Sequence, residues 1–128
     1  MIATLKQRAN VIRQIRAFFH ARDYLEVDTP LLCSHTVTDP HISSLSCTIP
    51  STQHTRYLQT SPEYAMKRLL AKGAGPLFQI TKAFRDDDVG RYHNPEFTIL
   101  EWYRPGFTHH ELMQEVDALM QQLFATPE

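Results

Sequence analysis

Apolar residues recur with a helical period near both ends of the chain. Near the N-terminus they are three or four residues apart, at Leu5, Ala9, Ile12, Ile15 and Phe19. Near the C-terminus the same spacing joins Leu112, Val116, Leu119 and Leu123, with Phe124 beside them. Thr4 with Gln7, and Thr108 with Glu111, have the spacing of capping boxes, which mark helix starts. The pattern therefore predicts an amphipathic helix at each end.

Short extended segments follow the first helix. Residues 24–29 alternate between apolar and polar side chains and stop at Pro30, which predicts a strand. The polar stretch 33–56 is predicted to be a loop around one short strand, Leu45–Ile49. A further strand is expected at Tyr57–Gln59.

A second helix is predicted after residue 60. Its start is the sequence Thr60-Ser-Pro-Glu63, which has a capping hydroxyl, a proline in the first turn and an acid near the positive end of the helix dipole. It is expected to end near Lys72, because Gly73 suits a left-handed cap.

A pair of long strands is predicted next, at residues 77–84 and 96–103, joined by the polar loop 85–94. Both faces of the second strand are largely apolar, so it is expected to lie in the centre of its sheet. Helices and strands do not alternate as βαβ units. The fold class is therefore predicted to be α+β, with an antiparallel sheet flanked by helices.

Composition and charge narrow the function classes. A chain of 128 residues corresponds to about one domain, and 42% hydrophobic with 21% charged residues excludes a disordered chain. The net charge of −1 supplies no global positive field for nucleic acid. No apolar run approaches the roughly 20 residues that span a bilayer, and two cysteines make no disulfide framework. A cytoplasmic domain without a membrane partner is expected.

The strand at 96–103 carries the first candidate chemistry. Alternation places Phe97, Glu101 and Tyr103 on one face, and a partly buried carboxylate requires a cationic partner. One possibility is an internal salt bridge from Glu101 to Arg85 or Arg104. The other is a ligand: Glu101 and Tyr103 would receive an ammonium group, and Phe97 would offer a flat face to a base.

The preceding loop offers three phosphate donors, Arg85, Arg91 and His93. The alternative is a solvated turn in which the acids at positions 86–88 neutralise the arginines. Glu63 could be a functional acid or only a cap. No metal site is predicted, because the spacing of Cys33, His35, His41 and Cys47 matches no standard zinc pattern.

The sequence from Phe84 to Tyr103 resembles motif 2 of class II aminoacyl-tRNA synthetases in its lysyl-tRNA synthetase form. The likeness rests on FRDD followed by RYHNPEFTILEWY. Residues 11–30, ending at Pro30, resemble motif 1, and residues 60–70 resemble the helix before motif 2. The resemblance implies the N-terminal part of a class II catalytic domain over 1–128, with motif 1 at about 11–30 and motif 2 at about 78–104.

Within this family the chain is most similar to the branch that modifies elongation factor P. The run GRYHNPEF, the run LEWYRP and the segment TVTDPH at 36–41 carry this likeness. No anticodon-binding domain is expected ahead of motif 1. The resemblance implies that ATP activates lysine or β-lysine as an adenylate, which is transferred to a lysine of elongation factor P. The alternatives are a fragment of a tRNA-charging lysyl enzyme, which is less favoured, and a non-catalytic remnant that dimerises or binds nucleotide.

The resemblance also implies individual roles. Arg85 would be catalytic, holding the α-phosphate of ATP and the amino-acid carboxylate. The other ATP-binding positions would be Asp87, which replaces the family's usual glutamate, together with His93 near the outer phosphates and Phe97 on the adenine. The lysine amino groups would be recognised by Glu63, Glu101 and Tyr103.

Two further expectations follow from the family. No glycine follows Gly106, so the Gly-rich motif 3, with its ATP-binding arginine, is not found in these residues and the likeness stops before it. The acids that hold Mg²⁺ are expected in the same C-terminal region, and the 128 residues alone are expected to be inactive. Motif 1 implies a homodimer, with Ile12, Ile15, Phe19 and Pro30 at its interface.

Overall fold

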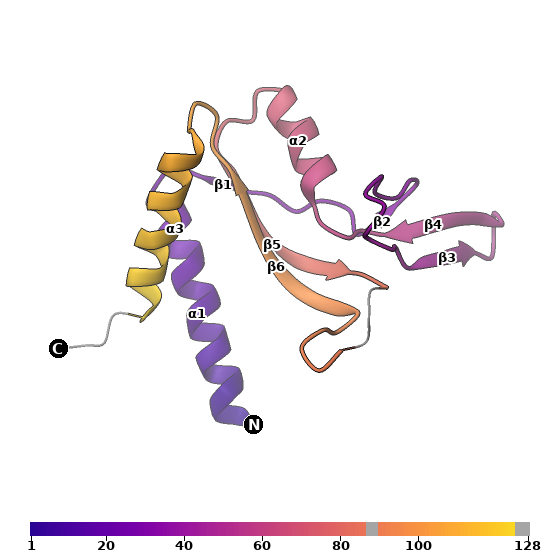
Figure 1. Cartoon of the computed structure of the whole chain (residues 1–128), viewed down its shortest axis with the longest axis horizontal. Helices are drawn as coiled ribbons and strands as arrows, with labels where there is room; N and C mark the ends of the chain where they lie inside the picture. Colours follow the sequence, from indigo (N-terminus) through magenta and orange to yellow (C-terminus); the bar gives the residue numbers. More distant parts are fainter. Residues whose placement is uncertain (87–89, 125–128) are drawn as a thin grey trace.

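A computed structural model describes residues 1–86 and 90–124. Its elements in chain order are α1 (Ile2–His20), β1 (Leu25–Glu26), β2 (Leu32–Cys33), β3 (Ser46–Ile49), β4 (His54–Leu58), α2 (Glu63–Ala71), β5 (Leu77–Phe84), β6 (Glu96–Tyr103) and α3 (His109–Phe124). Helices and mostly antiparallel strands are combined without βαβ repeats (Figure 1). The predicted α+β class is confirmed.

The centre of the fold is the hairpin of β5 and β6, whose bounds agree with the sequence prediction. The two strands pair antiparallel from Leu77 opposite Tyr103 to Phe84 opposite Glu96. The short strand β1 adds to the other edge of β5 and runs parallel to it. The sheet order is therefore β1-β5-β6, and in the part of the chain described here β6 lies at an edge. The prediction of a central position for β6 is therefore wrong. Its side chains are apolar on both faces, but they are at most half-buried.

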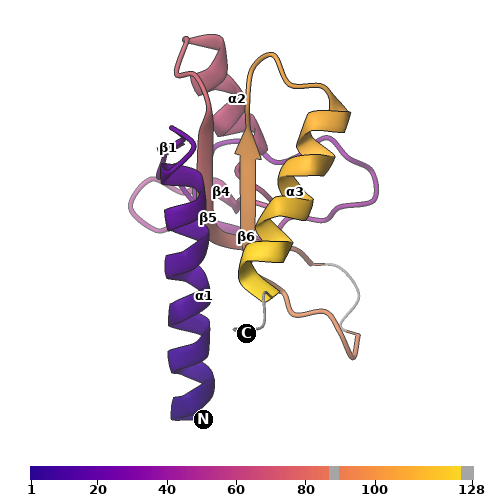
Figure 2. The same ribbon diagram turned by 90° about the vertical axis from the view of Figure 1, so that its left-hand side faces the viewer.

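One face of this hairpin is covered by α1 and α3, which lie side by side against it (Figures 1 and 2). The core between them is aromatic. Phe19 is fully buried and stacks on Phe78, with their ring centroids 4.8 Å apart. Tyr24 and Trp102 pack against the same ring at 5.1 and 5.3 Å. Burial of such large apolar side chains is the main stabilising contribution to a fold of this size.

A buried carboxylate joins α3 to this core. Glu115 accepts hydrogen bonds from the Tyr24 hydroxyl at 2.6 Å and from the Trp102 indole nitrogen at 3.0 Å. Burial, together with the bond to Glu115, raises the pKa of the Tyr24 hydroxyl well above its ordinary range. Glu115 therefore has the partners that a buried carboxylate requires.

The helix termini match the sequence prediction only in part. The Glu111 carboxylate accepts a hydrogen bond from the Thr108 backbone nitrogen at 2.6 Å, so the capping box of α3 is confirmed. In α1 the predicted box of Thr4 and Gln7 is wrong, because the helix already begins at Ile2 and no side chain caps it. Gly73 has φ +86°, as predicted for the end of α2.

The apolar stripe of α1 is largely internal. Ile15 and Phe19 are 9% and 0% exposed and belong to the core of the single chain. This burial removes them as contacts for a second copy, because the chain's own sheet already covers them. Ile12 is half-buried and Pro30 is exposed. The homodimer and the part of these last two residues in it stay predictions.

A second small sheet is formed where mostly loop is expected. Its order is β2-β4-β3, with both pairs antiparallel, and only β3 and the end of β4 are foreseen from the sequence. Most of its side chains are exposed, so no apolar alternation marks it. Among the described residues, no helix has both the length and the apolar character needed to cross a membrane.

Candidate active site

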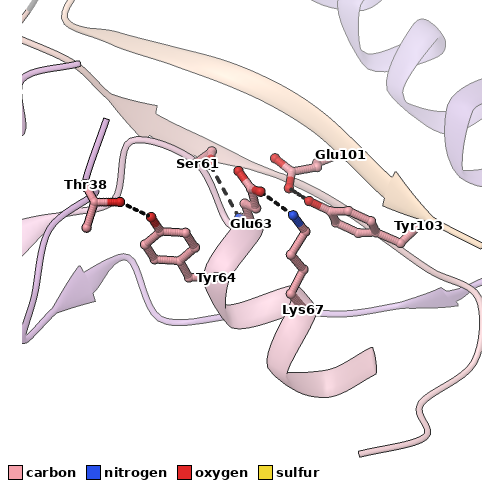
Figure 3. Close-up of polar contacts among 7 residues, drawn as sticks. All are labelled: Thr38, Ser61, Glu63, Tyr64, Lys67, Glu101 and Tyr103. Carbon is pink, nitrogen blue, oxygen red and sulfur yellow. Dashed lines mark hydrogen bonds and ion pairs between the residues drawn. The ribbon is translucent and has the colours of Figure 1, made fainter. Parts of the chain in front are cut away.

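The face of β6 turned away from the core carries the predicted site residues. Leu100 and Trp102 pack against the core, so alternation places Phe97, Glu101 and Tyr103 on the opposite side. Helix α2 lies over this side of the hairpin and brings Glu63, from its first turn, close to Glu101 and Tyr103 (Figure 3). The three residues predicted to recognise an amino acid therefore lie together.

Glu101 is held by a neighbouring hydroxyl rather than by a cation. The Tyr103 hydroxyl donates a hydrogen bond to Glu101 Oε1 at 2.6 Å. Burial raises the pKa of the Glu101 carboxyl, and the negative charge of Glu63 adds to this, although Tyr103, Lys67 and Arg85 act against it. Burial also raises the pKa of Tyr103. Both groups are thus held in a partly desolvated environment.

The internal salt bridge considered for Glu101 is not formed. Within residues 1–86 and 90–124, no ion pair with a nitrogen–oxygen distance of 4 Å or less includes Glu101. Arg104 instead donates to the backbone oxygen of Arg22 at 3.2 Å. Arg85 donates through Nε to the backbone oxygen of Thr60 at 3.2 Å. Neither arginine therefore pairs directly with Glu101.

Lys67 is a member of this cluster that sequence reasoning missed. Its Nζ lies 2.5 Å from Glu63 Oε1 and 5.9 Å from the centroid of the Tyr103 ring. The hydrogen bond to Glu63 is the main cause that raises the pKa of Lys67, and Glu101 contributes. The signal was present in the sequence, because residues four apart on a helix are neighbours.

The residues predicted to bind ATP are gathered only in part. The guanidinium carbon of Arg85 lies 5.1 Å from the centroid of the Phe97 ring, so these two predicted ATP ligands are in contact. His93 is exposed, and its backbone nitrogen donates to the Gly90 oxygen at 3.1 Å. No hydrogen bond or ring contact joins His93 to the other two in the described part of the chain. Asp87 lies outside the described residues.

A cavity of about 420 Å³ lies between Arg85 and the first turn of α2. Its lining includes Arg85, Glu63 and the loop residues 37–40 and 42, but not Phe97, Glu101 or Tyr103. Within this loop the Thr38 hydroxyl is 3.0 Å from the Tyr64 hydroxyl of α2 (Figure 3). The loop is thereby fixed to the helix that carries Glu63. A cation, a carboxylate and a polar wall thus face one space, which suits a ligand with both charges.

Comparison with known proteins identifies the family. A family model for class II tRNA synthetases of the D, K and N type matches residues 1–128. The chain belongs to this class II tRNA synthetase family. The predicted resemblance to class II synthetases is confirmed by this match over the whole chain, and the bounds of motifs 1 and 2 stay predictions.

Similar relatives of this synthetase-family chain bear one name, elongation factor P–(R)-β-lysine ligase. The protein of Pseudoalteromonas translucida (strain TAC 125) is 57% identical over 124 residues, which are 94% of this chain and 38% of the relative. That of Vibrio cholerae is 53% identical over the same shares. That of Haemophilus influenzae (strain PittGG) is 52% identical over 98% of this chain and 40% of its own length. The chain spans about two-fifths of the length of these curated relatives.

The acids of the site are engaged by neighbouring side chains rather than grouped as metal ligands. Within the described residues, no group of three or more histidine, cysteine, aspartate or glutamate side chains is arranged to hold a metal ion. Glu63 and Glu101 are engaged by Lys67 and Tyr103. The cluster on this side of the hairpin therefore consists of carboxylates, a lysine, a guanidinium and aromatic rings.

The stability of the chain should depend on pH through Glu101. A carboxyl whose pKa is raised above its ordinary value of about 4.5 in the folded state binds more protons there than in the unfolded chain. The free energy of unfolding of the wild type, relative to Glu101→Gln, should therefore fall as pH rises from about 4 to about 7. Urea unfolding of both proteins measures this difference.

Glu111→Gln provides a control of opposite sign. Hydrogen bonds from Thr108 lower the pKa of Glu111, so the wild type should gain stability over this variant as pH rises through the ordinary range of glutamate. If the free energy of unfolding relative to Glu101→Gln instead rose with pH, as expected for Glu111→Gln, Glu101 would be stabilised as a carboxylate. That result would contradict a desolvated environment for Glu101.

Proposed function

We propose that this chain is the N-terminal part of an ATP-dependent ligase. The ligase activates lysine or β-lysine as an aminoacyl-adenylate and transfers it to a lysine of elongation factor P. The names of the similar relatives and the class II family support this function. The observation that carries it is the cluster of Glu63, Glu101 and Tyr103 on the side of the hairpin turned away from the core, because two carboxylates and a ring suit a substrate ammonium.

In this proposal the carboxylates bind one end of the substrate and Arg85 binds the other. The carboxylates of Glu63 and Glu101 receive the amino groups of the substrate. Arg85, on the same side of β5 and β6, pairs with the substrate carboxylate and with a phosphate oxygen, since guanidinium groups suit such planar anions. The substrate carboxylate then attacks the α-phosphorus of ATP and pyrophosphate leaves. Positioning and charge neutralisation promote this step, without a covalent enzyme intermediate.

The residues present fit the nucleotide. ATP supplies the activated phosphate, with Mg²⁺ as its counter-ion, and we assign no described residue to the metal. Phe97 offers a ring for stacking on adenine. Arg85 now lies against that ring, so the base and the guanidinium must share it or take opposite faces.

Titrations of ATP and of L-lysine test this division of roles. The chain should bind ATP with a Kd near millimolar, about −4 kcal/mol. Arg85→Ala and Phe97→Ala should each remove ATP binding, because they delete the phosphate contact and the stacking surface. Glu101→Gln should leave ATP binding intact and weaken lysine binding. Arg13→Ala is the charge-matched control on α1, where Arg13 bonds only to Asn10 among its side-chain contacts in the described residues. Equal loss of ATP binding in Glu101→Gln and Arg85→Ala would refute the division.

A further inference from the structure

The amino group of Lys67 has the surroundings that the proposed function assigns to a substrate ammonium. It lies at hydrogen-bond distance from one carboxylate, Glu63 at 2.5 Å. It faces the ring of Tyr103 at 5.9 Å and experiences the negative charge of Glu101. Figure 3 shows Lys67 reaching from the second turn of α2 into the space between these side chains. A carboxylate pair with an aromatic face is a general binding arrangement for an alkylammonium.

We infer that Lys67 is the resident cation of this site and that it competes with the ammonium group of the incoming ligand. The identity of the ligand as lysine or β-lysine rests on the proposed function, but the competition does not. Lys67 thereby lowers the affinity of the site for any cation. A simple amine that displaces Lys67 gains only the contact with the carboxylates. An amino acid also gains a contact between its own carboxylate and Arg85.

The position of Lys67 allows it to leave. Its side chain is 55% exposed and that of Glu63 is 44% exposed, and exposed ion pairs four apart on a helix are weak. The four-carbon stem can turn the ammonium into solvent without moving the backbone. The cost of displacement is therefore small, and its effect is a modest, uniform reduction in affinity for every cation.

The test compares two cations on three forms of the full 128-residue chain. The forms are the wild type, Lys67→Met and the control Arg68→Met, which removes the same charge from the next residue of α2. Methionine keeps the length of the stem and favours a helix. The probes are L-lysine and n-butylammonium, titrated by NMR. Lys67→Met should bind both probes about threefold more tightly than the wild type, and Arg68→Met should match the wild type.

The outcomes separate this inference from the proposed function. If Lys67→Met binds n-butylammonium more tightly than the wild type does, the resident cation is supported. If L-lysine then binds no more tightly than n-butylammonium, that result counts against the proposed substrate. Unchanged or weaker binding of both probes by Lys67→Met overturns the inference, whatever the substrate. An equal gain in Arg68→Met also overturns it, because the effect would then be one of net charge.

Discussion

The 128-residue chain, purified by itself, should show no ATP–pyrophosphate exchange above background with lysine or β-lysine. Arg85 and Phe97 lie on one side of the proposed nucleotide site. The family resemblance assigns a further arginine to motif 3 and the Mg²⁺-binding acids to the same C-terminal region, and these residues include neither. Removing one preorganised charged or hydrogen-bonding group from a reacting centre typically costs about 3–4 kcal/mol. Without two such groups the rate should be lower by a factor of about 10⁴ or more.

The relative from Pseudoalteromonas translucida, of which this chain covers 38%, is the positive control for that assay. Binding of ATP by the 128-residue chain is the folding control, because it would require a folded motif 2 hairpin. Exchange clearly above background by the chain alone would contradict the prediction, because it would mean that one side of the site is sufficient.

Phe19→Ala should destabilise the chain by about 3–5 kcal/mol, a large part of the roughly 5–15 kcal/mol typical of a domain. Phe19 is 0% exposed and contacts Phe78, Tyr24 and Trp102, so its removal leaves a cavity at the meeting point of α1 and the sheet. Thermal and urea unfolding measure the loss. Leu5→Ala, on the same helix but 59% exposed, should change stability by no more than about 0.5 kcal/mol. Equal effects of the two variants would show that α1 does not pack as described.

The hairpin of β5 and β6 could be predicted in full because its pattern is local. Each strand is a run of apolar and β-branched residues bounded by turn residues, with Gly75 and Pro76 before β5 and a polar loop between the strands. The period of two also placed Glu101 and Tyr103 on one face, and their hydrogen bond confirms that placement. This part of the site follows directly from the covalent spacing of the residues.

Other features depend on contacts between distant segments. The sheet of β2, β4 and β3 consists of exposed strands whose pairing, not their apolar pattern, defines them. The edge position of β6 depends on which strands join the sheet, and β1 pairs with the far edge of β5. Helix α1 begins at Ile2, ahead of the capping pattern at Thr4 and Gln7, so a capping pattern alone does not determine where a helix begins.

The side-chain geometry of the site is the least predictable part. The resemblance assigned Arg85 and Phe97 to separate parts of ATP, yet the guanidinium lies on the ring, a choice of rotamer that sequence spacing does not determine. Lys67 belongs to the site because its amino group, on α2, lies beside Glu63 and the ring of Tyr103 (Figure 3). Sequence motifs therefore identify which residues carry the chemistry, whereas the packing of α2 determines which of them meet.

We propose that these 128 residues form the N-terminal part of a ligase acting on elongation factor P. The most direct measurement joins them to the remaining C-terminal part of the Pseudoalteromonas translucida relative and supplies ATP, labelled β-lysine, and either elongation factor P or lysine tRNA. We predict that label is transferred to elongation factor P and that Arg85→Ala in the joined protein abolishes the transfer. Labelling of the tRNA without elongation factor P, or labelling that survives Arg85→Ala, would contradict it.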